Sequence, residues 1–442
     1  MCSFLRHNGE ASIANQRQRQ CRRTGAPLDR LTLRLAVLSP FVDRRHGTER
    51  ALAELLERLA QNYGCEIHLY AQRVEGLRVS DSRSACGAQT GTIYWHKIPS
   101  IPGPHVLQFL GWILLNGSVR RWHRWTGRAS WDLVLSPGIN CLEPDVVIVH
   151  VLFHRLRELA REHDENQAAL GGLLRKLHRR IYYALLVRLE RKIYGDRSIR
   201  LAAVSKRTAH LLNEYFHRDD VSVIPNGVDA RHFSPDRRLA RRAEARHSRG
   251  LREEECVLLL VGNDWRIKGL PAVLEAVAAL PDLPLRLLVA GTDSPQYFQA
   301  KAQQLGVAER CRWESGSGEI LDFYAAADIY VSPSREDSFG LPVAEAMASG
   351  LPVITSSFAG VAEFVRDGEN GFVLQQPRNA QALAAVIRRL QQDSELRQRI
   401  GRAAVEVVRT QDWNRNAEAA WKLLTTRVQG PKREQPVTAS RS

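Results

Sequence analysis

The sequence predicts an α/β protein with two doubly wound domains, and three observations support this prediction. Its 442 residues exceed what one hydrophobic core usually serves. Short apolar segments alternate with helical patterns along most of the chain, which is typical of parallel sheets covered by helices. A strand, a glycine-containing loop and a helix also follow one another twice, from residue 31 and from residue 256. We therefore expect an N-terminal domain over residues 31–218 and a C-terminal domain over residues 219–410.

The composition is that of a globular protein, with 44% hydrophobic and 25% charged residues. No segment reaches the length of a membrane-spanning helix, and the start of the chain lacks the apolar region of a secretory signal. The seven cysteines are scattered without metal-binding spacing, which favours reduced thiols and a cytoplasmic location. Residues 1–30 and 429–442 are polar and without periodicity, and we expect both to be disordered tails.

The net charge of +15 indicates an acidic partner, which leaves nucleic acid, anionic lipid and a phosphorylated substrate as classes. No motif that reads DNA or RNA accompanies the charge, so we expect no nucleic-acid partner.

In the N-terminal half, residues 31–40 predict the first strand, residues 43–50 a loop and residues 51–60 a helix. Gly47 in this loop is a position where the backbone could approach a phosphate or a sugar, although a simple turn is the commoner explanation. His150 ends a predicted strand, at the carboxyl edge where doubly wound sheets bind ligands. A lone histidine is more often structural, and His154 is a nearby competitor for the same role.

Two predicted helices combine apolar and basic residues. Residues 105–125 join an apolar helical pattern to three arginines and three tryptophans, and residues 173–195 interleave arginine and lysine with leucine, isoleucine and tyrosine. Both patterns suit an anionic membrane surface. The alternatives are a core-packed helix with a basic end for the first segment and a solvated helix face for the second.

In the C-terminal half, residues 256–262 predict the first strand of a second sheet, and residues 270–280 the helix after it. The intervening turn carries Arg266 and Lys268. Two cations at the carboxyl end of a strand favour a phosphorylated ligand.

Residues 328–350 predict a short strand at Ile329–Val331, a turn, and a helix that opens between Phe339 and Leu341. The turn contains Glu336 and Asp337, and Gly340 lets a ligand approach the backbone closely. The free N–H groups of such a helix start suit a phosphate, and a carboxylate at Asp337 or Glu345, eight residues apart, could accept from sugar hydroxyls. An ordinary strand–turn–helix with solvated acids explains this segment equally well when it is taken alone.

The order of the motifs resembles the large retaining glycosyltransferase family 4, over about residues 32–428. The motifs are PNGVD at 225–229, VG and KG within 261–269, LVAG at 288–291, YAAADIYVSPS at 324–334, EDSFGLPVAEAMASGLPVI at 336–354 and DG.NG at 367–371. The resemblance implies the GT-B fold, in which two Rossmann-like domains face each other across a cleft. It also implies an N-terminal acceptor domain, a C-terminal donor domain, and a last helix, at about residues 411–428, that crosses back to the N-terminal domain.

The resemblance assigns roles to residues of both domains. Lys268 matches the lysine that neutralises the donor diphosphate, and the N–H groups of Phe339, Gly340 and Leu341 match those that hold it. Glu345 matches the acid that holds the ribose hydroxyls. The remaining assignments are Asp337 or its neighbour Glu336 at the transferred sugar, His150 near that sugar, Gly47 after His46 beside the diphosphate, and Arg266 in place of the family arginine, whose own position holds Asn263.

The function implied by the resemblance is a retaining hexosyltransferase. It would move a sugar from a GDP- or UDP-sugar, without metal or cofactor, to a saccharide or lipid-linked acceptor in cell-envelope polysaccharide or glycolipid synthesis. We expect a cytoplasmic protein with peripheral docking on the inner face of the membrane. Two alternatives remain open, namely a GT-B-fold sugar-nucleotide epimerase and a non-enzymatic protein that binds anionic lipid or nucleic acid.

Overall fold

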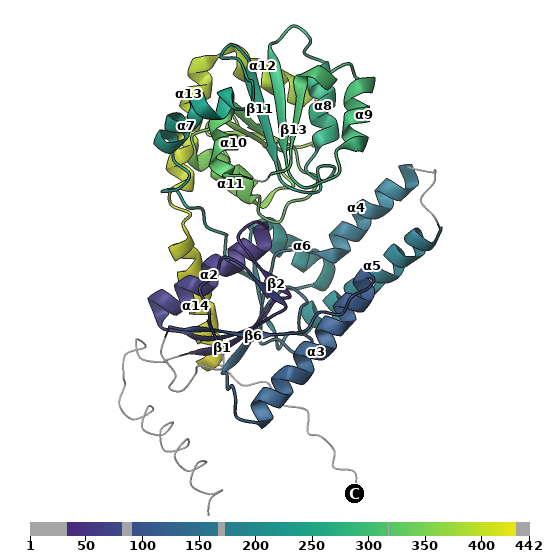
Figure 1. Ribbon diagram of the computed structural model, residues 1–442, viewed down its shortest axis with the longest axis vertical. Coiled ribbons are helices and arrows are strands. Elements are labelled where there is room, and N and C mark those ends of the chain that lie inside the picture. The colour runs from purple at the N-terminus through teal and green to yellow at the C-terminus, as the bar shows by residue number, and fades with distance from the viewer. Residues whose placement is uncertain (1–32, 82–90, 167–172, 317, 430–442) are drawn as a thin grey trace, which may run out of the picture.

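The computed structural model describes residues 33–81, 91–166, 173–316 and 318–429, which form two α/β domains (Figure 1). Each domain is built on a parallel sheet with helices on both of its faces, so the predicted fold class is confirmed. The predicted tails at 1–30 and 429–442 lie outside the described residues, except for Gln429, which ends the last helix.

The N-terminal sheet has eight parallel strands, and its central strands are buried on both faces. Along β1, Leu35 and Val37 pack on one side, whereas Ala36 and Leu38 pack on the other side with Trp112. Successive side chains of a strand point to opposite faces, which explains why this segment is apolar at consecutive positions. In spatial order the strands are β10 (Ser222–Val223), β9 (Arg200–Ala203), β8 (Val146–Val149), β7 (Leu133–Pro137), β1 (Arg34–Leu38), β3 (Glu66–Ala71), β6 (Ile93–Lys97) and β5 (Ser80–Asp81).

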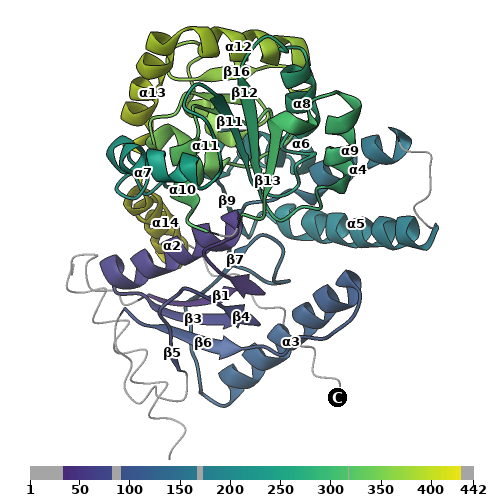
Figure 2. The same ribbon diagram turned by 45° about the horizontal axis from the view of Figure 1, so that its top comes forward.

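Two helices of this domain, α4 and α5, extend beside the C-terminal domain (Figures 1 and 2). A small parallel pair of strands, β2 and β4, accompanies the main sheet. The elements are α2 (Gly47–Tyr63), α3 (His105–Trp125), α4 (Phe153–Asn166), α5 (Leu173–Tyr194), α6 (Lys206–Phe216), β2 (Phe41–Val42) and β4 (Arg73–Val74).

The C-terminal sheet has six parallel strands in the order β13-β12-β11-β14-β15-β16. Its elements are α7 (Pro235–His247), β11 (Cys256–Val261), α8 (Leu270–Ala278), β12 (Leu285–Ala290), α9 (Gln296–Gln304), η3 (Ala308–Arg310), β13 (Cys311–Glu314), α10 (Ile320–Ala326), β14 (Ile329–Val331), α11 (Leu341–Ala348), β15 (Val353–Ser356), η4 (Gly360–Phe364), β16 (Phe372–Leu374), α12 (Ala380–Gln392) and α13 (Ser394–Val408).

Two segments cross between the domains side by side. The Val228 N–H donates to the carbonyl of Gln411 at 2.8 Å, and the amide of Asn416 donates to the carbonyl of Pro225 at 2.8 Å. A Cβ at Gly227 would lie 2.4 Å from the nitrogen of Trp413, so this approach requires glycine. The last helix, α14 (Trp413–Gln429), then packs against α2 of the N-terminal domain.

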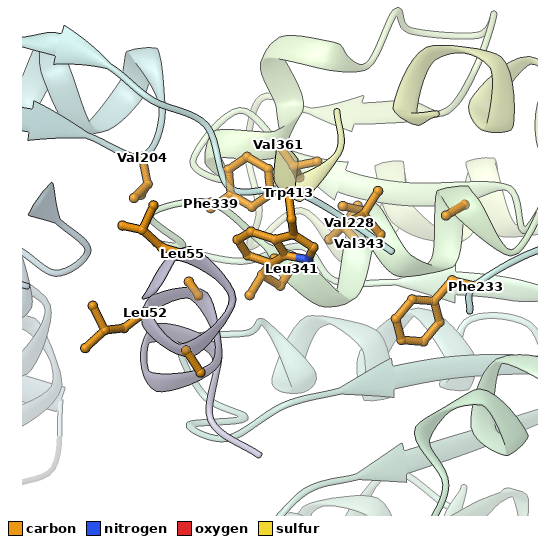
Figure 3. Close-up of a cluster of buried hydrophobic side chains, with 14 of the residues drawn as sticks. Leu52, Leu55, Val204, Val228, Phe233, Phe339, Leu341, Val343, Val361 and Trp413 are labelled. Atoms are coloured by element: carbon orange, nitrogen blue, oxygen red, sulfur yellow. The ribbon is translucent and has the colours of Figure 1, made fainter. Parts of the chain in front are cut away.

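A buried apolar cluster continues from one domain into the other (Figure 3). Leu52 and Leu55 of α2 lie in the same cluster as Phe339 and Leu341, and Trp413 lies among them. Apolar burial of this kind is the main attraction between packed elements. It brings the starts of α2 and α11 close together.

The structure corrects two boundaries in the N-terminal half. Residues 43–50 are not a loop throughout, because α2 already begins at Gly47. Residues 153–166 form a helix that the periodicity did not predict. Charged residues outnumber apolar ones in this segment, so its apolar face, which includes buried Leu159, is a weak signal in the sequence.

Candidate active site in the cleft

The start of α11 follows a turn that only glycine adopts easily. Gly340 caps the helix with a φ of 94°, in the left-handed region. Leu341 and Pro342 then occupy the first turn, where proline is tolerated because its missing N–H has no intrahelical partner. The predicted helix start is confirmed, and it presents the positive end of the helix dipole to the cleft.

The start of α2 meets the start of α11 from the other domain. A Cβ built on Gly47 would lie 3.7 Å from Cδ1 of Leu341. Asp43 holds the preceding turn, because its carboxylate accepts from the N–H groups of Arg45 and His46 and lies 2.8 Å from Nδ1 of His46. Burial opposes ionisation of Asp43, but the hydrogen bonds from His46 lower its pKa below the ordinary value. The N-termini of α2 and α11, which belong to different domains, thus face the same place.

Lys268 and Asp337 form an ion pair beside this place, with Nζ 2.5 Å from Oδ2. Asp264 shapes the loop that carries Lys268, since its carbonyl accepts from the Lys268 N–H at 3.0 Å. The N–H of Arg335 donates to the carbonyl of Ile267 at 2.7 Å and thereby joins this loop to the turn before α11. The cation and the acid thus belong to one rigid arrangement within the C-terminal domain.

Glu336 points away from its neighbour Asp337 and toward the N-terminal domain. Its carboxylate accepts from Nε of Arg155 on α4 at 3.2 Å and from Arg207 on α6 at 2.7 Å. The two adjacent acids are therefore committed to different partners. Of the two candidates for the first acid, Asp337 is the one beside Lys268.

Glu345 is 3% exposed and both of its oxygens are hydrogen-bonded. Arg50 of α2 donates to one oxygen across the domain boundary, and the hydroxyl of Tyr324 donates to the other at 2.7 Å. Burial, followed by the charge of Glu345, raises the pKa of Tyr324 well above its ordinary value, so the hydroxyl stays protonated. Arg50 and Tyr324 were not among the predicted site residues. The only signal for Arg50 was a cation one turn after the glycine loop.

Two other predicted residues, Arg266 and His150, have surroundings of their own. The Arg266 guanidinium lies 4.2 Å from the ring centroid of Tyr297 on α9, whereas Lys268 turns toward Asp337. His150 follows β8 and lines a small cavity with Leu52 of α2 and Asn226. Burial lowers the pKa of His150 to about 4, so it is neutral near pH 7.

Among the residues that the structure describes, no group of three or more His, Cys, Asp and Glu side chains could hold a metal ion. Among the helices in the described ranges, none has both the length and the apolar character needed to span a bilayer.

Two family models match the chain in succession. Residues 45–232 match Glycosyltransferase Family 4, and residues 241–407 match Glycosyl transferases group 1. The lipopolysaccharide glucosyltransferase WaaG of Escherichia coli K12 is 32% identical over 217 residues, which cover 47% of this chain and 56% of that protein. A D-inositol 3-phosphate glycosyltransferase of Thermomonospora curvata is 34% identical over 244 residues, 51% of this chain and 56% of that protein. The chain spans about half the length of the curated relatives it matches.

Solved structures show the same fold. The WaaG structure has a TM-score of 0.69 at 23% identity and covers 88% of this chain and 99% of that one. HepE of Anabaena, solved with UDP and glucose, has a TM-score of 0.63 at 18% identity and covers 89% and 100%. With the two family models in succession along its two domains, the chain belongs to the family 4 glycosyltransferases of the GT-B fold.

Proposed function

We propose that the protein transfers a sugar from a nucleotide-diphosphate sugar to a saccharide or lipid-linked acceptor, with retention at the anomeric carbon. The observation that carries this proposal is the convergence of Lys268, the start of α11 and the start of α2 on one place in the cleft. Backbone N–H groups and a lysine are the groups that hold a diphosphate in other proteins. The relatives named for glucosyl and glycosyl transfer support the same activity.

The donor would lie mainly against the C-terminal domain. Its diphosphate would face Lys268 and Gly340, with Gly47 on the opposite side, and its ribose hydroxyls would face Glu345. As the nucleotide of the donor we favour UDP over GDP, because HepE was solved with UDP. No cofactor is needed for this chemistry.

Transfer breaks the bond between the anomeric carbon and the diphosphate oxygen and forms a bond to the acceptor oxygen. Negative charge develops on the leaving diphosphate, where Lys268 and the two helix starts would stabilise it. Positive charge develops on the sugar, which Asp337 would face. The acceptor hydroxyl attacks from the same face, and its proton passes to an oxygen of the leaving diphosphate.

We also propose that the N-terminal domain docks through α3 and α5 on the cytoplasmic face of an anionic membrane. Docking there would bring a lipid-linked acceptor close to the cleft. The two helices touch where the rings of His105 and Tyr182 lie 6.4 Å apart. Along α3, Leu114 is 69% exposed and Trp125 is 84% exposed, and several arginines share the helix. Exposed apolar side chains next to cations suit a lipid interface.

Pelleting with liposomes tests the docking. We expect binding to anionic vesicles and little binding to neutral ones, with a marked loss in Leu114→Asp. Leu239 of α7 is 55% exposed on the other domain, so Leu239→Asp is the matched control. Equal losses in the two variants, or no preference for anionic lipid, would exclude this surface.

A panel of sugar nucleotides tests the activity. One sugar nucleotide should raise the melting temperature, because a ligand that binds only the folded state stabilises it. Release of free nucleotide should then increase when a saccharide or lipid-linked acceptor is added. An epimerase would convert the sugar nucleotide without any acceptor, and a non-enzymatic binding protein would show no turnover with any donor.

A further inference from the structure

A second pocket opens between the end of α4 and the start of α8, where the two domains meet. It is open to solvent and is lined by residues of both domains. Three of the lining side chains are arginines, namely Arg266, Arg335 and Arg378. Apart from the donor role expected for Arg266, none of the roles assigned above uses this pocket.

The charges in the pocket are unbalanced. Glu162 on α4 shares one carboxylate oxygen between Arg335, at 2.5 Å, and Arg378, at 2.6 Å. Glu275, on the opposite wall, lies 2.7 Å from Lys301 and is thereby neutralised. Burial, followed by the positive charge of Arg378, lowers the pKa of Arg335, and Arg155 and Arg266 act in the same direction. An additional anion would relieve this repulsion.

The pocket adjoins the reaction site through the backbone. Arg335 precedes Asp337 by two residues, and Gly269, which follows Lys268, lines the pocket. Along α4, Arg155 faces Glu336 near the cleft, and Glu162 faces the pocket seven residues further on. A helix rises ~1.5 Å per residue, so the pocket lies roughly 10 Å outward along α4 from Arg155. This is the side from which a second substrate would extend.

We propose that this pocket binds a phosphate group carried by the acceptor saccharide, an inference that rests on the proposed transfer activity. Planar guanidinium groups bind phosphate through paired hydrogen bonds, and the phosphate would replace the carboxylate of Glu162 between Arg335 and Arg378. Glu162 is half exposed and can turn to solvent when it is displaced. The acceptor then lies along α4, with its attacking hydroxyl near Asp337.

Calorimetric titration with saturating UDP present tests the pocket, because UDP fills the donor site. The probes are glucose 6-phosphate, glucose and inorganic phosphate. We expect glucose 6-phosphate to bind more tightly than either of the others. Arg378→Gln should weaken that binding at least about tenfold, as expected when a charge-assisted hydrogen bond is lost. Glu162→Gln should tighten it, because the competing carboxylate is gone.

Arg366 provides a matched control, since it is an exposed arginine of the same domain that pairs only loosely with Glu369. Arg366→Gln should leave the affinity for glucose 6-phosphate unchanged. Three results would overturn the inference. The affinity for glucose 6-phosphate could be unchanged in Arg378→Gln, it could fall in Glu162→Gln, or glucose or inorganic phosphate could bind as tightly as glucose 6-phosphate. UDP binding is measured in the same samples. Its absence would contradict the proposed donor site, whereas intact UDP binding without glucose 6-phosphate binding contradicts only the phosphate pocket.

Discussion

The two walls of the cleft reach the site in different ways. On the C-terminal wall, Lys268 and Asp337 come from two loops at one sheet edge and pair with each other. On the N-terminal wall, Arg50, Arg155 and Arg207 come from three different helices, and each pairs with an acid of the opposite domain. The C-terminal wall therefore keeps its geometry when the domains separate, whereas the contacts of the N-terminal wall exist only when they are together.

The domains should also differ in their response to acid, and this is the largest effect that we expect. Within the described ranges, the histidines with a lowered pKa all lie in the N-terminal domain. Burial lowers the pKa of His68, His123 and His96, the last to about 3, and neighbouring positive charges add to the effect. The carboxylate of Glu66, 3.0 Å from Nε2 of His68, acts in the opposite direction on the pKa of His68, but burial outweighs it.

The unfolded chain, with histidine pKa values of about 6.5, binds more protons than the folded chain in acid. Stability is therefore complete above pH 6.5 and falls as the pH drops toward the folded-state values. The free energy of unfolding should decrease by up to about 1.4 kcal/mol per pH unit for each buried histidine. Hydrogen exchange at pH 7 and pH 5 should show the N-terminal sheet opening first. His96→Gln should reduce the dependence of the unfolding free energy on pH, whereas His247→Gln, at an exposed position, should not. A parallel loss of exchange protection in both domains would contradict the expected difference between them.

Removing the cation of the C-terminal wall should have the next largest effect. Lys268→Ala takes away the positive charge opposite the leaving diphosphate, and turnover should fall on the order of 100-fold. The measurement is release of UDP from the donor with saturating acceptor. Lys422→Ala is the control, because Lys422 also pairs with an acid, Glu418, but is exposed on α14. Near-normal turnover in Lys268→Ala would remove this residue from the mechanism.

The adjacent acids Glu336 and Asp337 separate the two walls within one turn. Asp337→Asn should lower kcat by at least about tenfold, because it removes a charge that faces the developing cation on the sugar. Glu336→Gln weakens only the contacts to Arg155 and Arg207, so it should leave kcat within about threefold and act mainly on domain closure. Small-angle scattering would report that closure. If the two variants lose turnover equally, the assignment of Asp337 as the first acid fails.

The same contrast explains how far the sequence could predict the site. The turn before α11 is set by local chemistry, since Gly340 needs a positive φ and Pro342 fits the first helical turn, so this element was predicted, whereas its role in binding a phosphate stays a prediction. Lys268 was singled out because it lies in the turn after a strand, and its role also stays a prediction. Arg50 was not singled out, because its pairing with Glu345 joins residues 295 positions apart. No local pattern encodes a contact that exists only after two domains pack.

The same distinction between local patterns and long-range contacts applies to the fold. Apolar strands with helices between them give a periodic signal, so both sheets were predicted. The helix α4 was missed because charged residues outnumber its apolar ones, and two of these charged residues, Arg155 and Glu162, pair with residues of the other domain. Arg266 was given a role at the donor from its position near Lys268 in the sequence. Its side chain stacks on Tyr297, and the donor role stays a prediction.

The pair of Arg50 and Glu345 is the smallest effect that we expect, and it measures the coupling between the walls. Arg50→Ala leaves the Glu345 carboxylate buried, with the Tyr324 hydroxyl as a donor. The single variants Arg50→Ala and Glu345→Gln should therefore each lower the stability of the protein and its affinity for UDP. The double variant Arg50→Ala, Glu345→Gln should lose less than the sum of the two, by about 1 kcal/mol, because no buried charge is left unpaired. Arg58→Ala on the same helix, whose partner is Glu54, should add to Glu345→Gln without coupling. If the effects of Arg50→Ala and Glu345→Gln simply add, Arg50 and Glu345 are not coupled. The closed arrangement of the two domains would then depend on apolar packing alone.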